Sequence, residues 1–182
     1  MADYVAFLRG INLGNRRLKM ERLRELGEEL GFADAATFIA SGNLIFASGA
    51  RDAGKLEKKI ETHLARALGY EVDTFVRTRA EVAALAAARP FAAADLDAED
   101  ATIHVGFWKE EPKAEWVRAL EGAQTATDAI VIAGREFFWR CRGPSHASKF
   151  WSAPAVRAAK LPTMTMRNRR MVQRLTAEFP PR

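Results

Sequence analysis

The fold of the N-terminal half is decided by the stretch Thr37-Phe38-Ile39-Ala40-Ser41-Gly42-Asn43-Leu44-Ile45-Phe46-Ala47. Two apolar runs rich in strand-forming residues, 37–40 and 44–47, flank a short polar segment. Its Gly42-Asn43 pair suits a two-residue turn that needs a positive φ at its first central position. The pattern therefore predicts a β-hairpin.

Strands and helices are indicated on both sides of this hairpin. Residues 4–8 form a short apolar run, and Met20, Leu23, Leu26 and Leu30 then recur at helical spacing, with Gly31 at the expected C-terminal cap. A second amphipathic helix is predicted over residues 56–68 and a fourth strand over 72–76. The order β-α-β-β-α-β up to Arg77 is typical of the split ferredoxin-like unit.

The second half repeats this order. We expect a strand over 101–108, a short helix over 115–120, and a hairpin in which Gly134-Arg135 joins runs 130–132 and 137–139. The repeated order favours a structural duplication without sequence identity, and a coincidence of common elements is the alternative explanation. A helix over 79–88 and the acidic stretch 95–100 join the halves, and the acidic stretch is interpreted as a solvated linker.

The C-terminal part is less regular. A helix interrupted by Pro154 is expected over 148–159, and Asn168 is expected to cap a last helix. The predicted fold is thus α+β, with two ferredoxin-like subdomains that have antiparallel sheets, plus a C-terminal helical segment. The predicted domains are 1–78, a linker over 79–100, and 101–182.

Composition restricts the class of protein. The 182 residues, 48% of them hydrophobic, suffice for one ordinary domain or two small ones. A single cysteine, Cys141, excludes an intramolecular disulfide and a zinc site built from several thiolates. The chain shows neither a signal-peptide pattern at its start nor an apolar run long enough to cross a bilayer. We expect a cytoplasmic protein with no membrane partner, no metal and no cofactor; its oligomeric state stays open.

Positive charge is concentrated near the C-terminus. Residues 137–177, the acid-free window, contain no Asp or Glu, and the rest of the chain holds 19 basic against 23 acidic residues, a net charge of −4. A surface of one sign attracts polyanions or anionic ligands. Nine basic residues lie in the window: Arg140, Arg142, Lys149, Arg157, Lys160, Arg167, Arg169, Arg170 and Arg174.

A second basic segment lies between the first strand and the first helix. Arg16, Arg17 and Lys19 cluster where a helix start already carries partial positive charge, and Gly10 and Gly14 would let a ligand approach the backbone. The segment is not a Walker loop, because the glycine-lysine-serine/threonine ending is missing. It predicts an anion site or, alternatively, a glycine-containing connection with solvated charges.

Two further groups of residues are candidates for base stacking or for nucleophilic catalysis. Trp139, Phe150 and Trp151 are interleaved with the acid-free window and could stack on bases, but each one alone is more typical of a core. The group around Ser148 and Lys149, with Cys141, Ser145 and His146, fits no nucleophile signature, so catalysis by it is disfavoured. The strand at 43–48 does not match the RNA recognition motif, and that mode of binding is disfavoured too.

The chain resembles a bacterial family known as domain of unknown function 1697. The resemblance rests on the following residues: 4–14, Lys19-Met20 followed by Leu23, Gly31-Phe32 leading into 37–43, Arg89-Pro90-Phe91, Ser148-Lys149, and 165–168 with Val172 and Leu175. Arg169 and Met171 depart from the family pattern. It implies two ferredoxin-like α/β subdomains and no established activity, cofactor or catalytic residue. The matching polar positions are the candidate ligand-binding residues: Arg9, Asn12, Lys19, Ser41, Asn43, Arg167 and Asn168.

Three functions remain open at this stage. The first is a protein that binds a phosphate-rich or other anionic ligand, either nucleic acid or a nucleotide. The second is an enzyme that acts on a small anionic substrate in a cleft between the subdomains. The third is a structural or interaction protein in which the matching polar residues serve turns and caps.

Overall fold

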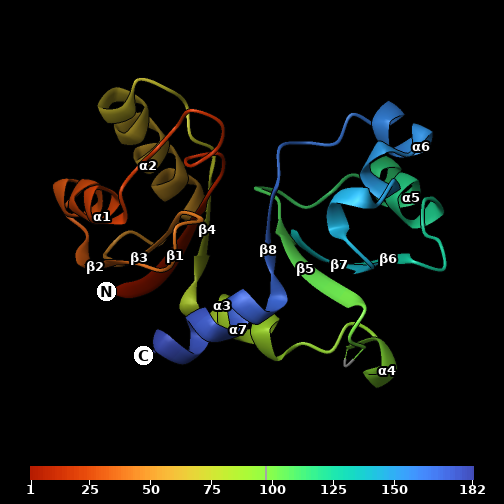
Figure 1. The fold of residues 1–182 in the computed structure, drawn as a ribbon. Coiled ribbons are helices and arrows are strands. Elements are labelled where there is room, and N and C mark those ends of the chain that lie inside the picture. The colour runs from red at the N-terminus through yellow and green to blue at the C-terminus, as the bar shows by residue number, and fades with distance from the viewer. Residues whose placement is uncertain (97) are drawn as a thin grey trace. The chain divides into compact units, whose positions relative to one another are not determined.

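Two four-stranded antiparallel sheets organise the chain (Figure 1). The computed structural model describes residues 1–96 and 98–182, so Asp97 of the expected acidic linker lies outside the described residues. The chain divides into unit 1, Met1–Ala84 with Arg174–Arg182, and unit 2, Leu85–Gln173. The domain boundaries expected at 78 and 100 stay a prediction, and the last nine residues of the chain are grouped with unit 1.

Unit 1 has the predicted β-α-β-β-α-β order. Its strands are arranged β2-β3-β1-β4, and all neighbours are antiparallel. This is the arrangement expected of a ferredoxin-like unit. Its elements are β1 (Ala2–Leu8), α1 (Met20–Glu29), β2 (Ala33–Thr37), β3 (Asn43–Ser48), α2 (Ala53–Leu68) and β4 (Thr74–Thr78), followed by α3 (Arg79–Ala87).

Helix α2 shows how the sequence sets an element. Asp52 caps its start, since its carboxylate accepts a hydrogen bond from Lys55 N at 3.1 Å. Gly69 ends it with a left-handed backbone, φ 76°. The apolar residues Leu56, Ile60 and Leu64 lie three to four residues apart and are buried in the core of unit 1.

The hairpin is present, but the expected two-residue turn is wrong. Strand β2 ends at Thr37 and β3 begins at Asn43, so the loop covers residues 38–42. Asn43 is fully buried and its amide donates to Phe38 O at 2.8 Å, which places it in the strand. Gly42 keeps its positive φ of 76°, and a Cβ there would lie 2.6 Å from the Ile11 side chain. The glycine is therefore required by both its φ and close packing.

The outer edge of β4 is closed by carboxylates. Edge strands expose a row of unpaired N–H groups that invites association. Here the outward N–H groups of three residues donate to glutamates at 2.7–2.8 Å: Thr74 to Glu61, Val76 to Glu57 and Thr78 to Glu81. Two of these glutamates, Glu57 and Glu61, come from α2, so the helix covers the sheet and its edge at once.

Unit 2 repeats the topology with strand order β6-β7-β5-β8. The second hairpin of the chain, β6–β7, confirms the predicted two-residue turn: Ala133 pairs with Glu136, and Gly134 has φ 62°. Its elements are α4 (Ala93–Leu96), β5 (Ala101–Phe107), α5 (Ala114–Gly122), β6 (Asp128–Ala133), β7 (Glu136–Arg142), α6 (Pro154–Ala158) and β8 (Thr165–Asn168), with α7 (Arg169–Glu178) ending the fold.

The C-terminal region differs from expectation in one respect and agrees in another. Instead of an interrupted helix over 148–159, two short 3-10 turns precede α6, which starts at Pro154 because proline suits a first helical position. Strand β8 was not singled out from the sequence. Asn168 caps α7 as predicted, since its side-chain oxygen accepts from Arg170 N at 2.9 Å.

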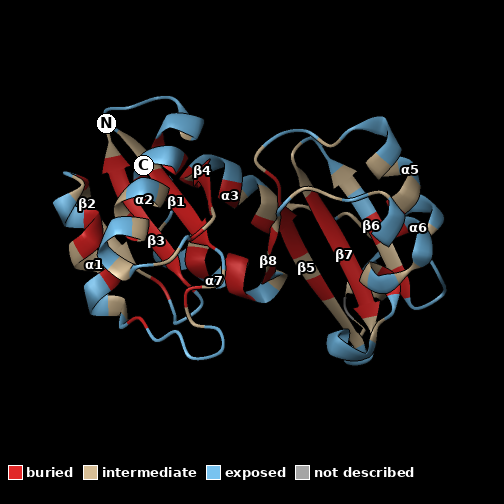
Figure 2. Ribbon diagram, turned by 90° about the horizontal axis from the view of Figure 1, so that it is seen from above, coloured by how far each residue is buried: buried red, intermediate tan, exposed pale blue. Residues whose placement is uncertain are grey.

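Each unit has its own core, and burial is concentrated in the central strands (Figure 2). Unit 1 buries an aliphatic and aromatic cluster that includes Phe46. Unit 2 buries the aromatic residues Trp108, Phe137, Trp139 and Phe150. In the described part of the chain, none of the helices combines the length and apolar character that crossing a bilayer requires.

Candidate functional site

The basic loop, residues 9–19, leads from the end of β1 to the start of α1. Asn12 organises it: its side-chain oxygen accepts from Leu18 N at 2.7 Å, and its amide donates to Leu18 O at 3.3 Å and Ala40 O at 2.9 Å. The last contact joins the basic loop to the β2–β3 loop. The first role of Asn12 is therefore to position these two loops.

The cations of the basic loop mostly meet neutral groups. Arg16 donates to Gly10 O at 3.4 Å and lies 4.2 Å from the centre of the Tyr70 ring. Arg17 donates to Gly14 O and Arg16 O, each at 2.8 Å. Lys19 is exposed at the N-cap of α1 and its side chain makes no capping hydrogen bond. Carbonyl contacts orient a guanidinium but do not cancel its charge.

Arg9 is the one cation of the basic loop with an acidic partner among the described contacts. Its guanidinium lies 3.4 Å from the Asp73 carboxylate, and both side chains are about half exposed. An ion pair of this kind is worth at most about 1 kcal/mol, since solvent screens it. Arg9 can therefore exchange Asp73 for an anionic ligand at little cost.

Ser41 and Asn43 lie beside the basic loop with different exposure. Gly42 O accepts from Leu8 N at 2.8 Å, which holds the β2–β3 loop against the end of β1. Ser41 is exposed and accepts from the Asn43 amide at 3.0 Å. Asn43 itself is buried and serves the hairpin. The structure thus brings Arg9, Asn12, Lys19 and Ser41 to one end of unit 1.

Arg167 and Asn168 belong to unit 2 and lie in β8. Arg167 is buried and donates to Thr165 Oγ1 and Met166 O, both at 2.9 Å. Burial lowers its pKa to about 10, so it stays cationic at neutral pH. Asn168 is exposed and caps α7. Both residues therefore have internal partners in their own unit.

Much of the acid-free window is used by the fold. Arg140 lies 2.6 Å from Asp95, and Arg142 lies 2.8 Å from both Asp95 and Asp100. These contacts, first the hydrogen bond from Arg140, lower the pKa of the Asp95 carboxyl. Arg169 donates to Ala86 O and Ala88 O at 3.3 and 2.9 Å. The compensating acids lie over 40 residues upstream, which the local composition could not show.

The aromatic residues of the same window belong to the core of unit 2 or pack against it. Trp139 and Phe150 are buried, and Trp151 packs against both of them with ring-centre distances of 5.6 and 5.0 Å. Stacking on exposed bases requires an accessible ring face. The structure therefore supports the core interpretation of these aromatics.

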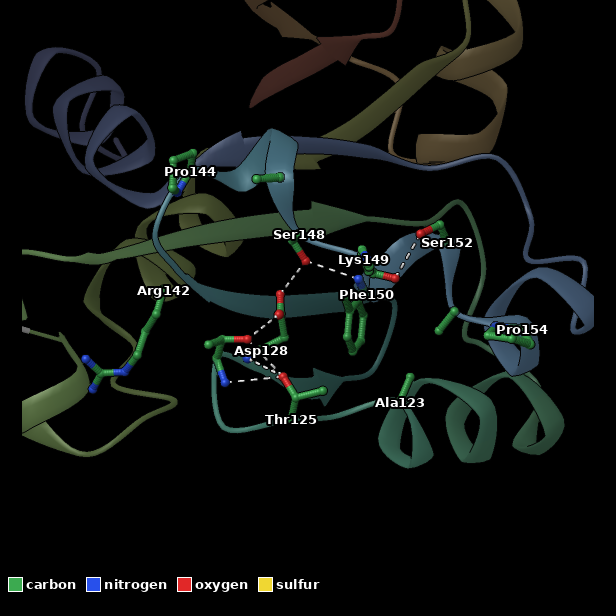
Figure 3. A pocket seen from close by; sticks show the side chains of 13 residues that line it. Ala123, Thr125, Asp128, Arg142, Pro144, Ser148, Lys149, Phe150, Ser152 and Pro154 are labelled. Atoms are coloured by element: carbon green, nitrogen blue, oxygen red, sulfur yellow. Dashed lines mark hydrogen bonds between the residues drawn. The ribbon is translucent and has the colours of Figure 1, made fainter.

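A pocket of about 590 Å³ lies in unit 2 beside the Ser148-Lys149 pair (Figure 3). At its floor, Asp128 Oδ1 accepts from Ser148 Oγ at 2.6 Å and from Trp139 Nε1 at 3.1 Å. Asp128 Oδ2 accepts from Thr127 Oγ1 at 2.9 Å. Ser148 Oγ in turn accepts from Phe150 N at 3.1 Å. The polar groups on this floor therefore bond mainly to one another.

This arrangement offers little for catalysis. A serine nucleophile needs a base that carries its proton away, and Ser148 faces a carboxylate whose two oxygens already accept other donors. Burial, aided by the nearby Asp128 charge, raises the pKa of the Cys141 thiol and disfavours the reactive thiolate. Within residues 1–96 and 98–182, no cluster of three His, Cys, Asp or Glu residues is placed to hold a metal ion.

Sequence reasoning missed a third feature, the outward side of α2. Lys55, Lys58, Lys59, His63 and Arg66 gather there around a shallow hollow of about 380 Å³. Their spacing of three to four residues is the signal that could have found them, since it places side chains on one helix face.

Comparisons with known proteins place the fold. The solved structure of conserved bacterial protein SP0830 from Streptococcus pneumoniae is similar with a TM-score of 0.74, at 21% identity over 98% of both chains. At that identity the likeness shows the fold alone. A search of curated proteins found no match. The family model described as "Protein of unknown function (DUF1697)" matches residues 1–138, and the chain therefore belongs to this family.

Proposed function

We propose that unit 1 binds the phosphate groups of an anionic ligand, a nucleotide or a nucleic acid, through the basic loop. The observation that carries this proposal is the charge of Arg16, Arg17 and Lys19. In the described part of the chain, Arg16 and Arg17 contact carbonyl oxygens and one aromatic ring, and none of the three side chains contacts a carboxylate.

Local electrostatics favour an anion at this place. The sequence between Asp3 and Glu21 contains four basic residues and no acidic one. Lys19 and its neighbours stand at the start of α1, where the helix itself presents about half a positive charge. Like charges crowded at a positive helix end repel one another, and a bound phosphate would relieve that repulsion while accepting several N–H donors.

The candidate residues take two kinds of role in this proposal. Arg9 and Lys19, with Arg16 and Arg17, would contact the ligand directly. Asn12, Ser41 and Asn43 would act as positioning residues, because their hydrogen bonds hold the basic loop and the β2–β3 loop in place. A contribution of Arg167 and Asn168 from unit 2 stays a prediction.

The test compares two triple variants with equal loss of charge. The loop variant carries Arg16→Gln, Arg17→Gln and Lys19→Gln. The control variant carries Arg118→Gln, Arg157→Gln and Lys160→Gln, which replaces two arginines and one lysine that are exposed in unit 2. Fluorescence polarisation would follow a labelled nucleoside triphosphate and a short labelled single strand over a series of salt concentrations.

We expect the loop variant to lose binding of both probes and the control variant to keep it. For the single strand, three lost phosphate contacts should lower the slope of log affinity against log salt by about 2. Equal losses in both variants would show that only net charge matters, and the proposal would then fail. Far-UV circular dichroism would verify that both variants remain folded.

A further inference from the structure

The outward face of α2 carries cations without intervening acids. Its members are Lys55, Lys58, Lys59 and Arg66, together with His63, and we call it the cationic face of α2. The helix also contains Glu57 and Glu61, but both side chains turn to the edge of β4. The separation of charge on α2 is thus produced by the fold, because the sheet edge takes up the two carboxylates.

The partners of these cations leave most of the charge uncompensated. Lys59 donates to Leu30 O at 2.7 Å, a neutral carbonyl at the end of α1. Lys55 lies 4.0 Å from Asp52, the capping residue, and its side chain is 84% exposed. His63 lies 3.0 Å from Glu29, which also pairs with Arg22. Lys58 and Arg66 have no carboxylate partner in the part of the chain that the structure describes.

The cationic face leads toward the basic loop. Tyr70 follows the Gly69 cap of α2, lies under the Arg16 guanidinium and donates its hydroxyl to Ile11 O at 3.3 Å. Arg66 stands one helical turn before Tyr70 and shares a hollow with the acidic residues Glu61, Glu71 and Asp73. Tyr70, with the Arg16 guanidinium above its ring, therefore joins α2 to the basic loop within unit 1.

We propose that the cationic face of α2 follows the phosphodiester backbone of a nucleic-acid strand that also reaches the basic loop. The eleven residue steps from Lys55 to Arg66 span roughly 16 Å at the rise of an α-helix. One strand of a duplex carries a phosphate about every 3.4 Å of axis, so this length faces about five phosphates. The inference rests on the proposed function, because it identifies the phosphate-bearing ligand as a polymer.

A nucleic-acid strand fits this face better than a lipid surface. Amphipathic helices that bind bilayers insert apolar side chains beside their cations. The apolar residues of α2, Leu56, Ile60 and Leu64, are all buried in the core of unit 1. The exposed face therefore offers charge in a row and no apolar anchor, which is the pattern of backbone contacts.

The test uses an α2 variant with Lys55→Gln, Lys58→Gln and Arg66→Gln. Lys59 and His63 are kept, since they bond to α1. The probes are the labelled single strand and the labelled nucleoside triphosphate, and the unit 2 triple variant again serves as the charge-matched control. Phosphatidylserine vesicles provide the lipid arm, and thermal melting verifies folding.

The expected result is selective. The α2 variant should bind the strand about tenfold or more weakly at low salt, with a slope lowered by about 2, and should bind the nucleotide as the wild type does. An unchanged strand slope in the α2 variant, with the loop variant still defective, would overturn this inference and leave the proposed function intact. A normal loop variant would overturn the proposed function instead. Vesicle binding that is lost in the α2 variant, without strand binding, would overturn the assignment to nucleic acid.

Discussion

Replacement of Glu57 by leucine should destabilise unit 1 by about 4 kcal/mol. Glu57 Oε1 accepts from Val76 N at 2.8 Å and lies 3.9 Å from Arg77 Nη1, and the side chains of Glu57 and Arg77 are 7% and 0% exposed. Loss of an acceptor for a buried N–H costs about 1–3 kcal/mol. Loss of one partner of a buried ion pair costs about 3–5 kcal/mol, and the long distance here favours the lower end. The two terms share one carboxylate and do not add fully.

Glu61 provides the matched control. Its side chain accepts from Thr74 N at 2.8 Å on the same strand edge, and Thr74 is also buried. Glu61→Leu removes the acceptor for Thr74 N, so we expect a loss of about 1–2 kcal/mol. Glu57→Gln should fall between the two leucine variants, because an amide oxygen can still accept from Val76 N while the charge is gone.

The assay must report on unit 1. All four tryptophans, at positions 108, 116, 139 and 151, lie in unit 2, so tryptophan fluorescence follows the wrong unit. Hydrogen exchange of the β1, β3 and β4 amides in urea would give the free energy of unfolding of unit 1. Equal losses for Glu57→Leu and Glu61→Leu would refute the reasoning, because the buried Arg77 charge would then contribute nothing.

Three further predictions concern packing, pH and the loops. Gly106→Ala should cost unit 2 about 3 kcal/mol in tryptophan-monitored unfolding, since a Cβ would lie 1.9 Å from the Phe137 ring, and Phe137→Leu should recover part of the loss. Burial lowers the pKa of His104, so below about pH 6.5 the unfolded chain binds a proton more readily than the folded chain, and unit 2 should lose stability as pH falls. His104→Gln should abolish the part of this pH dependence that comes from His104, measured by urea titrations at pH 7.5 and 5.5. Asn12→Ala should cost about 1–2 kcal/mol and weaken nucleotide binding, because three hydrogen bonds hold the basic loop through Asn12; full binding by a variant with faster loop exchange would contradict this.

Element types were predictable from the sequence because they depend on local patterns. Apolar periodicity predicted α1 and α2, and Gly134-Arg135 correctly indicated a two-residue turn. The turn predicted for the first hairpin from the same kind of local pattern was wrong, because the Asn43 amide donates across the loop to Phe38 O and Asn43 joins the strand. Side-chain contacts of this kind override turn statistics, and no local pattern reveals them.

The candidate site was less predictable, since function depends on which charges find partners. In the sequence, Arg140 and Arg142 have no acidic residue within three positions, and the same is true of Arg16 and Arg17. The fold gives the first pair the carboxylates of Asp95 and Asp100, while the second pair meets carbonyl oxygens. Distant pairing of this kind cannot be inferred from local composition.

The same principle explains why the proposal for nucleic-acid binding uses α2 and not the acid-free window. Its sequence mixes lysines with Glu57 and Glu61 and looks balanced, yet the edge of β4 takes up both carboxylates through backbone N–H groups. Those hydrogen bonds hold both carboxylates at the edge of β4, while Lys58 and Arg66 are exposed. The two glutamates that close the edge of β4 are therefore the ones that leave the opposite face of α2 to its cations. A variant that frees Glu61 from the edge should accordingly weaken nucleic-acid binding along α2 even though every lysine is retained.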